Sequence, residues 1–296
     1  MEYEEFAQIL NRHIFVGDKK ALLINIAESP ERYIGLFRPT KPKAKLLQNL
    51  LQSHEIRFGD AMEELIKGLI HELGYRLLPE RIRDAEGNDL SIDIYFTDDQ
   101  KYYFVEQKVR DDHDSAKKRG QIRNFEVKLD FLHRLHGDQL AGCMYFIDPE
   151  LVKNKIYYAD ELRKFSAFYS VELHLFYGAE FFSYLGHLDT WQNLLDWLTL
   201  WKESLPEIPE INFDLSPQES FDEIKNLSNR YWRRIIQNDR LWRSGIMQVL
   251  FRDGGTLMLL LNYFYGQSQA PYPSLTDGLV EKLTTYYPSL QLKERR

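Results

Sequence analysis

The sequence of 296 residues predicts an α/β fold, and the order of its helical and strand-like segments is the main reason. An amphipathic helix is followed by two neighbouring strand-like runs, a second helix and two further strands. These segments are residues 57–74, 90–96, 101–108, 122–136, 141–147 and 171–177. Helical patterns also precede and follow this core, which predicts helical N- and C-terminal extensions.

The first core helix is predicted by the spacing of its apolar residues. They recur at intervals of three and four, and they are Met62, Leu65, Ile66, Leu69, Ile70 and Leu73. Gly74 is placed to end this helix. Glu63 lies next to the apolar stripe, which makes it a candidate for a functional site; the alternative is a first-turn acid favoured by the helix dipole.

The two strand-like runs that follow predict a hairpin. In residues 90–96 the apolar side chains alternate with polar ones, so Asp93 lies on the face opposite the aliphatic residues. Residues 97–100 form a polar turn, and in residues 101–108 Glu106 and Lys108 share a face. If the runs pair, Asp93 approaches Glu106 across the sheet with Lys108 beside them, although register is weakly specified by sequence.

Two converging acids and a lysine are the components of a metal-dependent phosphodiesterase site. Mg²⁺ prefers carboxylate and water oxygens, so Asp93 and Glu106 can hold it and leave positions open for a phosphate oxygen and a water. Lys108 can orient that water or help its deprotonation. The alternative is an exposed strand pair, Glu106 and Lys108, with Asp93 as an acid close to a turn.

A basic segment follows the second strand and leads into the helix of residues 122–136, which continues through Val127 and Leu135. Residues 101–134 contain nine Lys or Arg and six Asp or Glu, a local charge of +3 in a chain of net charge −7. Such an excess suits contact with a phosphate backbone, and the alternative is a solvated loop. The candidate DNA-binding residues here are Lys117, Lys118, Arg119 and Gln121.

With these residues in place, the chain resembles the PD-(D/E)xK nuclease superfamily, and most of all its type II restriction endonucleases. The resemblance covers roughly residues 55–185, and its most distinctive parts are residues 59–63 and 106–115. It implies a restriction-endonuclease-like core, which is a mixed β-sheet flanked by helices. It also implies Mg²⁺-dependent hydrolysis of DNA that leaves 5′-phosphates.

The resemblance also implies a role for each candidate residue. Asp93 and Glu106 would be metal ligands, Lys108 would lie at the attacking water, and Glu63 would be a supporting acid of the metal site. Ile92 stands where the superfamily has proline. This departure leaves Asp89 as an alternative to Asp93 for the first metal ligand.

The flanking regions are expected to be helical. We expect residues 1–54 to pack on the core or to form a dimer contact, residues 55–205 to form the nuclease core, and residues 206–296 to serve DNA recognition or dimerisation. In the last region, arginines at helical spacing next to aromatic residues can contact phosphates or guanine edges. They include Arg230, Arg233 and Arg234, for which the alternative is surface salt bridges with the acids of residues 217–224. The neighbouring tryptophans are expected in the core.

Composition and missing motifs exclude several classes of protein. The single cysteine, Cys143, excludes an intramolecular disulfide and a multi-cysteine zinc site. The first residues lack the pattern of a signal peptide and no apolar run is long enough to span a membrane, so we expect a cytoplasmic protein. There is no phosphate-binding loop, nucleophile elbow or dinucleotide fingerprint.

We expect a restriction enzyme that cuts double-stranded DNA at a short specific sequence, and this expectation determines the expected partners. A palindromic site favours a homodimer, and host DNA needs protection by a methyltransferase encoded nearby. Two alternatives remain. One is a repair or recombination nuclease on the same core, and the other is a catalytically silent DNA-binding module.

Overall fold

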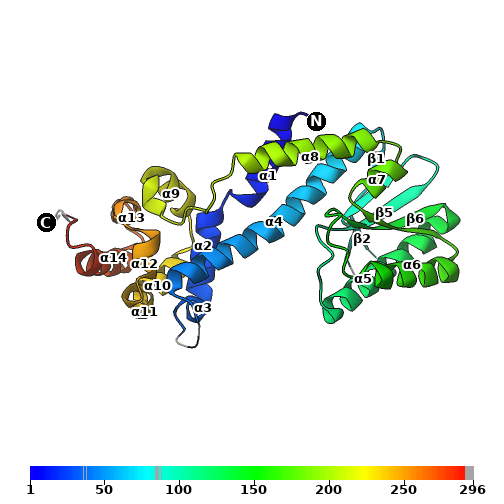
Figure 1. Ribbon diagram of the computed structural model, residues 1–296. Coiled ribbons are helices and arrows are strands. Elements are labelled where there is room, and N and C mark those ends of the chain that lie inside the picture. The colour runs from blue at the N-terminus through cyan, green and yellow to red at the C-terminus, as the bar shows by residue number, and fades with distance from the viewer. Residues whose placement is uncertain (36, 38, 84–86, 88, 291–296) are drawn as a thin grey trace. The chain divides into compact units, whose positions relative to one another are not determined.

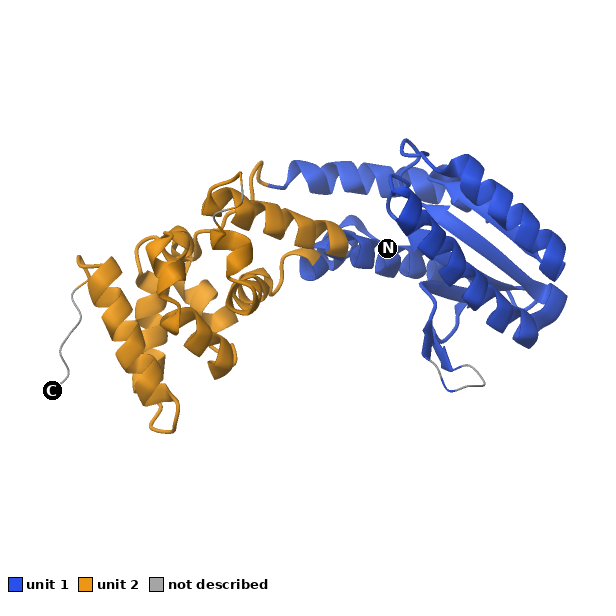
Figure 2. Ribbon diagram, turned by 90° about the horizontal axis from the view of Figure 1, so that it is seen from below, with its two compact units in different colours: residues 1–13, 57–205 blue, residues 14–56, 206–296 orange. Residues whose placement is uncertain are grey.

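The computed structural model describes residues 1–35, 37, 39–83, 87 and 89–290. The chain forms two compact units, each built from two segments (Figure 2). Unit 1 contains residues 1–13 and 57–205, and unit 2 contains residues 14–56 and 206–296. The sequence predicted three consecutive segments, whereas each unit combines an early segment of the chain with a later one.

A five-stranded mixed sheet forms the centre of unit 1. Its strands, in spatial order, are β1 (Arg76–Leu77), β4 (Ile94–Thr97), β5 (Tyr102–Lys108), β6 (Leu140–Phe146) and β7 (Glu172–Tyr177). Strand β4 is antiparallel to its neighbours β1 and β5, while β5, β6 and β7 are parallel. This sheet confirms the predicted α/β class with a mixed sheet flanked by helices.

Helices cover both faces of this sheet. Helices α5 (Ser115–His136) and α6 (Lys155–Tyr169) connect the parallel strands and lie on the same face (Figure 1). Phe104 of β5 packs there against Phe125 of α5, with ring centroids 4.9 Å apart. On the opposite face, Tyr145 of β6 stacks on Phe181 of α7 (Ala179–Tyr184) at 4.7 Å. The other helices of this part of the chain are α1 (Tyr3–Ile14), α8 (Leu188–Glu203) and the 3₁₀ helix η1 (Gly137–Gln139).

Helix α4 (Pro42–Glu72) is much longer than the helix predicted from residue 57. It continues without a break through the polar stretch between the two apolar patterns, and it passes from unit 2 to unit 1 at residue 57. Glu63 is therefore deep inside the helix, and the alternative that it is a first-turn acid is wrong. The end of the helix is as predicted, because Gly74 follows with a positive φ of 94°.

The predicted strand of residues 90–96 is divided in two. Strand β3 (Asp89–Ser91) pairs with β2 (Arg81–Arg83) in a separate two-stranded sheet, the chain bends at Ile92 and Asp93, and β4 begins at Ile94. The predicted hairpin is confirmed for β4 and β5, which pair with Ile94 opposite Val105. Asp93 thus lies at the junction between the two sheets.

The basic residues Lys117, Lys118 and Arg119 belong to the start of a helix, so the alternative of a solvated loop is wrong for them. The side chain of Asp114 accepts hydrogen bonds from the backbone N–H groups of Ala116 and Lys117, so α5 begins at Ser115. Two apolar residues expected within this helix, Val127 and Leu135, are 48% and 57% exposed. The buried face of α5 carries instead Ile122, Phe125, Lys128, Leu129 and Leu132.

Unit 2 is helical, as predicted for the extensions. Besides the first part of α4, it contains α2 (Asp18–Glu28), α3 (Glu31–Ile34), η2 (Phe213–Leu215), α9 (Pro217–Ile224), α10 (Asn229–Gln237), α11 (Asp239–Arg243), α12 (Ile246–Leu250), α13 (Gly255–Tyr265) and α14 (Tyr272–Tyr286). Trp232 and Trp242 are each 1% exposed in its core, as expected from the sequence. Among the described residues of both units, no helix combines the length and apolar character needed to cross a membrane.

Candidate active site

Asp93, Glu106 and Lys108 converge where β4 begins and β5 ends. The register places Ile94 opposite Val105, so the next residues along the two strands, Asp93 and Glu106, are neighbours. Lys108 Nζ lies 3.0 Å from Asp93 Oδ2 and 2.8 Å from Glu106 Oε1. The structure therefore brings together the three side chains that the hairpin prediction placed side by side.

Burial argues against the alternative of an exposed strand pair. The side chain of Glu106 is 3% exposed, that of Asp93 is 17% exposed and that of Lys108 is 27% exposed. Glu106 is withdrawn from solvent because it lies on the face of the sheet that α5 covers. The backbone N–H of Gln107 also donates to Asp93 Oδ2 at 3.0 Å, which orients this carboxylate at the bend.

Lys128 of α5 completes this cluster and was not predicted from the sequence. Its side chain is 5% exposed, and its Nζ lies 3.2 Å from Asp93 Oδ1 and is also bonded to Glu106 Oε2. A signal was present in the sequence, because Lys128 falls three residues after Phe125 and four before Leu132 in the apolar stripe of α5. A lysine in such a stripe is expected to need a buried partner.

Glu63 lies at the edge of the site and is held by Lys67. Lys67 Nζ lies 2.9 Å from Glu63 Oε1 and 2.6 Å from Glu80 Oε1. Burial raises the pKa of Glu63, Lys67 opposes that rise, and the nearby charge of Asp93 adds to it, so the net pKa is above its usual value. Among the described residues, no hydrogen bond joins Glu63 to Asp93, Glu106 or Lys108. Glu80 is a further acid beside the site that was not predicted from the sequence.

The charge state of Lys108 is determined by its two acidic neighbours. Burial lowers the pKa of Lys108, but the carboxylates of Glu106 and Asp93 outweigh burial and raise it above the usual value. Lys108 is therefore an ammonium group that donates hydrogen bonds at neutral pH.

Asp89, the alternative ligand, makes a different contact. Its side chain is 71% exposed, and its Oδ1 lies 2.9 Å from Arg83 Nε across the β2–β3 ribbon. The geometry thus favours Asp93 over Asp89 as the partner of Glu106.

The donors at this site suit a hard cation. The four carboxylate oxygens of Asp93 and Glu106 are each paired with an ammonium group, two with Lys108 and two with Lys128. Carboxylate oxygens are the ligands that Mg²⁺ prefers, and these two carboxylates converge on positive charge in the metal-free protein. In the part of the chain that the structure describes, no group of three or more His, Cys, Asp or Glu is arranged to hold a metal ion.

The candidate DNA-binding residues lie in both units. On α5, Lys117 and Arg119 are exposed, Lys118 Nζ lies 4.4 Å from the ring centroid of Tyr157, and Gln121 accepts a hydrogen bond from the Tyr158 hydroxyl. On α10, the three candidates are exposed: Arg230, Arg233 and Arg234. None of the ion pairs among the described residues joins them to the acids of residues 217–224, which removes support for the salt-bridge alternative.

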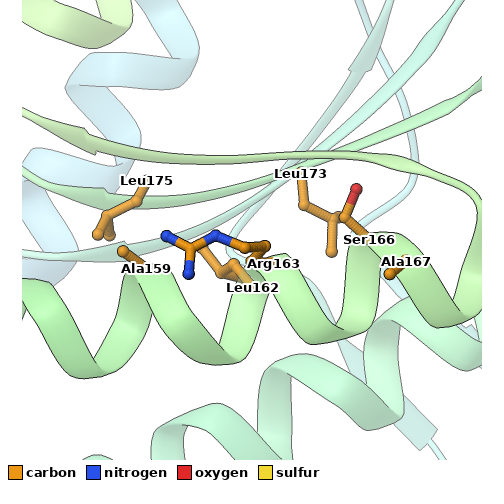
Figure 3. A pocket seen from close by; sticks show the side chains of 7 residues that line it. All are labelled: Ala159, Leu162, Arg163, Ser166, Ala167, Leu173 and Leu175. Atoms are coloured by element: carbon orange, nitrogen blue, oxygen red, sulfur yellow. The ribbon is translucent and has the colours of Figure 1, made fainter.

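A groove between α6 and β7 lies outside this site. It is lined by Ala159, Leu162, Arg163, Ser166, Ala167, Leu173 and Leu175. Figure 3 shows the Arg163 side chain lying between the helix and the strand. The groove contains none of the predicted catalytic residues, so the candidate chemistry remains at the β4–β5 hairpin.

One known protein family matches most of the chain. The model of the HinfI type II restriction endonuclease family matches residues 2–85 and 76–202. No curated protein sequence is significantly similar to the chain. The match confirms the prediction of a type II restriction endonuclease, a site-specific deoxyribonuclease whose substrate is DNA. Type II restriction endonucleases generally use a divalent metal ion.

Proposed function

Because this chain belongs to the HinfI family of type II restriction endonucleases, we propose that it hydrolyses double-stranded DNA at a short specific sequence with Mg²⁺. The convergence of Asp93, Glu106 and Lys108 at the β4–β5 hairpin carries the proposal for where the reaction takes place. Two acids and an ammonium group within hydrogen-bonding distance supply the charges that phosphodiester hydrolysis needs.

Asp93 and Glu106 are the proposed metal ligands, with Glu63 as a supporting acid. A divalent ion bound there would lower the pKa of a water and stabilise charge on the phosphate. The bend at Asp93 and the hydrogen bond from the Gln107 N–H hold the first carboxylate, and burial under α5 holds the second. Glu63 would support the metal site through its negative charge. Lys67 holds its side chain in place and also bonds to Glu80.

Lys108 is the proposed residue at the attacking water. Lys108 is an ammonium group in the metal-free protein. In the reaction it would orient the attacking water and the scissile phosphate, or help to deprotonate that water. The water oxygen forms a bond to phosphorus and the bond from phosphorus to the 3′ oxygen breaks. The water loses a proton, the 3′ oxygen gains one, and the products carry a 5′-phosphate and a 3′-hydroxyl.

Two groups of residues, all of them basic except Gln121, are proposed to contact the DNA. Those on α5 are Lys117, Lys118, Arg119 and Gln121, and they follow the catalytic strand directly. Those on α10 are Arg230, Arg233 and Arg234. The exposure of Lys117, Arg119 and the three arginines of α10 supports the proposal, because arginine and lysine that reach phosphates must be open to solvent in the free protein.

The wider setting belongs to the same proposal. A homodimer would place one site on each strand of a palindromic sequence. A DNA methyltransferase encoded nearby would protect host DNA, and the enzyme would act in the cytoplasm, where that DNA is found.

Digestion of a plasmid of known sequence tests the proposed function. With Mg²⁺, the wild-type protein should give discrete bands with 5′-phosphate ends. Asp93→Ala and Lys108→Ala should abolish cleavage, while Asp99→Ala and Lys101→Ala serve as matched controls. These controls change exposed residues on the turn of the same hairpin, 74% and 46% exposed, and should cut normally.

The two alternatives predict different results in the same assay. A repair or recombination nuclease would give a smear or would cut only branched or flapped substrates. A silent binding module would shift DNA in a gel with Ca²⁺ and leave it intact with Mg²⁺. Either result would reject the assignment of a restriction reaction to this hairpin.

A further inference from the structure

Two lysines share the same pair of carboxylates, one from each side. Lys108 bonds to Asp93 Oδ2 and Glu106 Oε1, and Lys128 bonds to Asp93 Oδ1 and Glu106 Oε2. Two negative and two positive charges thus lie in alternation. The outer side of this group is formed by Lys108, which is 27% exposed, and the inner side by Lys128, which is 5% exposed.

The two lysines differ in how readily their ammonium groups can move away from the carboxylates. Lys108 also donates to the backbone oxygen of Gln107 at 2.6 Å, so it keeps a partner if it releases the carboxylates. Among the described residues, the hydrogen bonds of Lys128 go to these two carboxylates alone. Lys128 belongs to the buried face of α5, between Phe125 and Leu132, and its side chain is only 5% exposed.

We propose that Lys128 is a fixed internal counter-ion that sets the metal affinity of the site. This inference rests on the proposed function, because it takes Asp93 and Glu106 as the metal ligands. Without metal, Lys128 compensates the buried charge of Glu106, which would otherwise destabilise the fold strongly. When a divalent cation enters from the side of Lys108, Lys128 stays behind the ligands and its charge opposes the cation. Lys128 therefore lowers the metal affinity of the site and stabilises the metal-free enzyme.

The repulsion between Lys128 and a bound divalent ion should have a measurable effect on metal affinity. At about 4 Å, repulsion between an ammonium group and a divalent ion lowers affinity roughly 30-fold even at the dielectric constant of water. Removal of the Lys128 charge should therefore raise divalent-ion affinity by about tenfold or more. It should also lower the melting temperature of the metal-free protein by about 10 °C, because one member of a buried ion pair is lost.

Ca²⁺ binding to Lys128→Met and Lys128→Gln tests the inference without reference to cleavage. Affinity is measured by titration calorimetry, and stability by thermal unfolding with and without Ca²⁺. Gln keeps a hydrogen-bond donor and removes the charge, so both variants should bind Ca²⁺ more tightly than wild type and be rescued by it. If Gln behaves as wild type, Lys128 acts through hydrogen bonding and the inference is overturned.

Lys282 provides a matched control. It is also a nearly buried lysine, 8% exposed, that bonds to two carboxylates, those of Asp239 and Glu281, in unit 2. Lys282→Met should lower the melting temperature without changing Ca²⁺ affinity. If it raises Ca²⁺ affinity as much as the Lys128 variants do, the effect is general to the protein charge and the inference is rejected.

A double variant separates failure of this inference from failure of the proposed function. Glu106→Gln combined with Lys128→Met removes both inner charges, so the metal-free double variant should be more stable than Lys128→Met alone. If wild type neither binds Ca²⁺ nor cuts DNA, the proposed function fails, whereas this stability coupling still tests the counter-ion. Equal or weaker Ca²⁺ binding by the Lys128 variants, with wild type binding normally, overturns the inference alone. If the single variants unfold in the absence of metal and Ca²⁺ does not refold them, the inference is also wrong.

Discussion

Asp111 should be one of the most sensitive positions of unit 1, although it lies three residues beyond Lys108 and takes no part in the proposed chemistry. Its side chain is fully buried. It accepts hydrogen bonds from Asn154 N at 2.7 Å, Asn154 Nδ2 at 2.8 Å and the Tyr177 hydroxyl at 2.9 Å. Asp111 also forms an isolated parallel bridge with Val152, so the chain after the catalytic strand is tied to the loop before α6.

The expected destabilisation by Asp111→Ala follows from these three hydrogen bonds. Each bond to a charged group contributes about 1.5–3 kcal/mol, but bonds to one carboxylate are not additive. Removal of the acceptor also leaves buried donors on Asn154 and Tyr177 without a partner. Removing one member of a buried charged network typically costs about 3–5 kcal/mol, and we expect a loss in that range. This is a large part of the roughly 5–15 kcal/mol by which domains are stable.

Urea unfolding, followed by circular dichroism, measures this loss, and hydrogen exchange shows where it occurs. In Asp111→Ala, peptides from β5, β6 and the start of α6 should exchange faster, while peptides from unit 2 should be unchanged. Asp112→Ala is the matched control, because Asp112 is the next residue and its side chain is 50% exposed. It should change stability by less than about 0.5 kcal/mol. Equal stability of the two variants would refute the view that Asp111 anchors this loop.

Three further predictions concern packing and charge elsewhere. Gly142→Ala should destabilise unit 1 by about 1–3 kcal/mol in urea unfolding, because an added Cβ would lie 2.5 Å from the Phe104 ring; unchanged stability would contradict this overpacking. Trp242→Ala should destabilise unit 2 by about 3–5 kcal/mol, and full stability with weakened DNA binding would instead make this tryptophan a base-stacking residue. The hydrogen bond from Lys101 holds the pKa of Glu172 at about 2, so its stabilising effect is complete above about pH 4.5 and disappears as the pH falls through 2. Glu172→Gln should therefore be about 1 kcal/mol less stable than wild type at pH 7, after allowance for solvent screening, with a difference that vanishes at acid pH and not at alkaline pH.

The hairpin and its three polar residues could be predicted from the sequence because the signals are local. Alternation of apolar and polar residues marks the strands, and the turn between them is recognisable from Asp98 and Asp99. Asp98 Oδ1 accepts hydrogen bonds from the backbone of Gln100 and Lys101, and Asp99 has a positive φ of 68°. The turn joins the two strands directly, and the pairing of Ile94 with Val105 then brings Asp93 close to Glu106.

The break at Asp93 and the length of α4 could not be predicted in the same way. Alternation continues through Asp93, so nothing local shows that β3 pairs with β2 and β4 with β5. In α4, the apolar pattern is interrupted before Met62, which resembles the end of one helix and the start of another. The interruption occurs where the helix passes from one unit to the other, and the rest of each unit comes from distant parts of the chain.

Lys128 was missed because its partners are 22 and 35 residues away in sequence. Within α5 alone, a lysine in the apolar stripe indicates that a buried partner is needed, but the helix does not show which residues provide it. Its role becomes visible only when the parallel pairing of β5 with β6 has placed α5 over Glu106. Knowledge of the acids at the hairpin, together with the apolar positions of α5, would have been enough to suggest it.

The departure at Ile92 from the proline of the superfamily has a structural reason in this chain. The backbone N–H of Ile92 donates to the carbonyl oxygen of Glu80 at 2.9 Å, and Ile92 itself is 1% exposed. Proline has no N–H and would lose this bond, which joins the start of the β2–β3 ribbon to the bend. The bend then lets Asp93 leave the ladder, so its carboxylate takes the Gln107 N–H as a partner. In a continuous strand Asp93 would lie directly opposite Glu106, and the two carboxylates would repel each other. Here the bend turns Asp93 out of the ladder, and Lys108 and Lys128 each bond to both carboxylates, which offsets the repulsion.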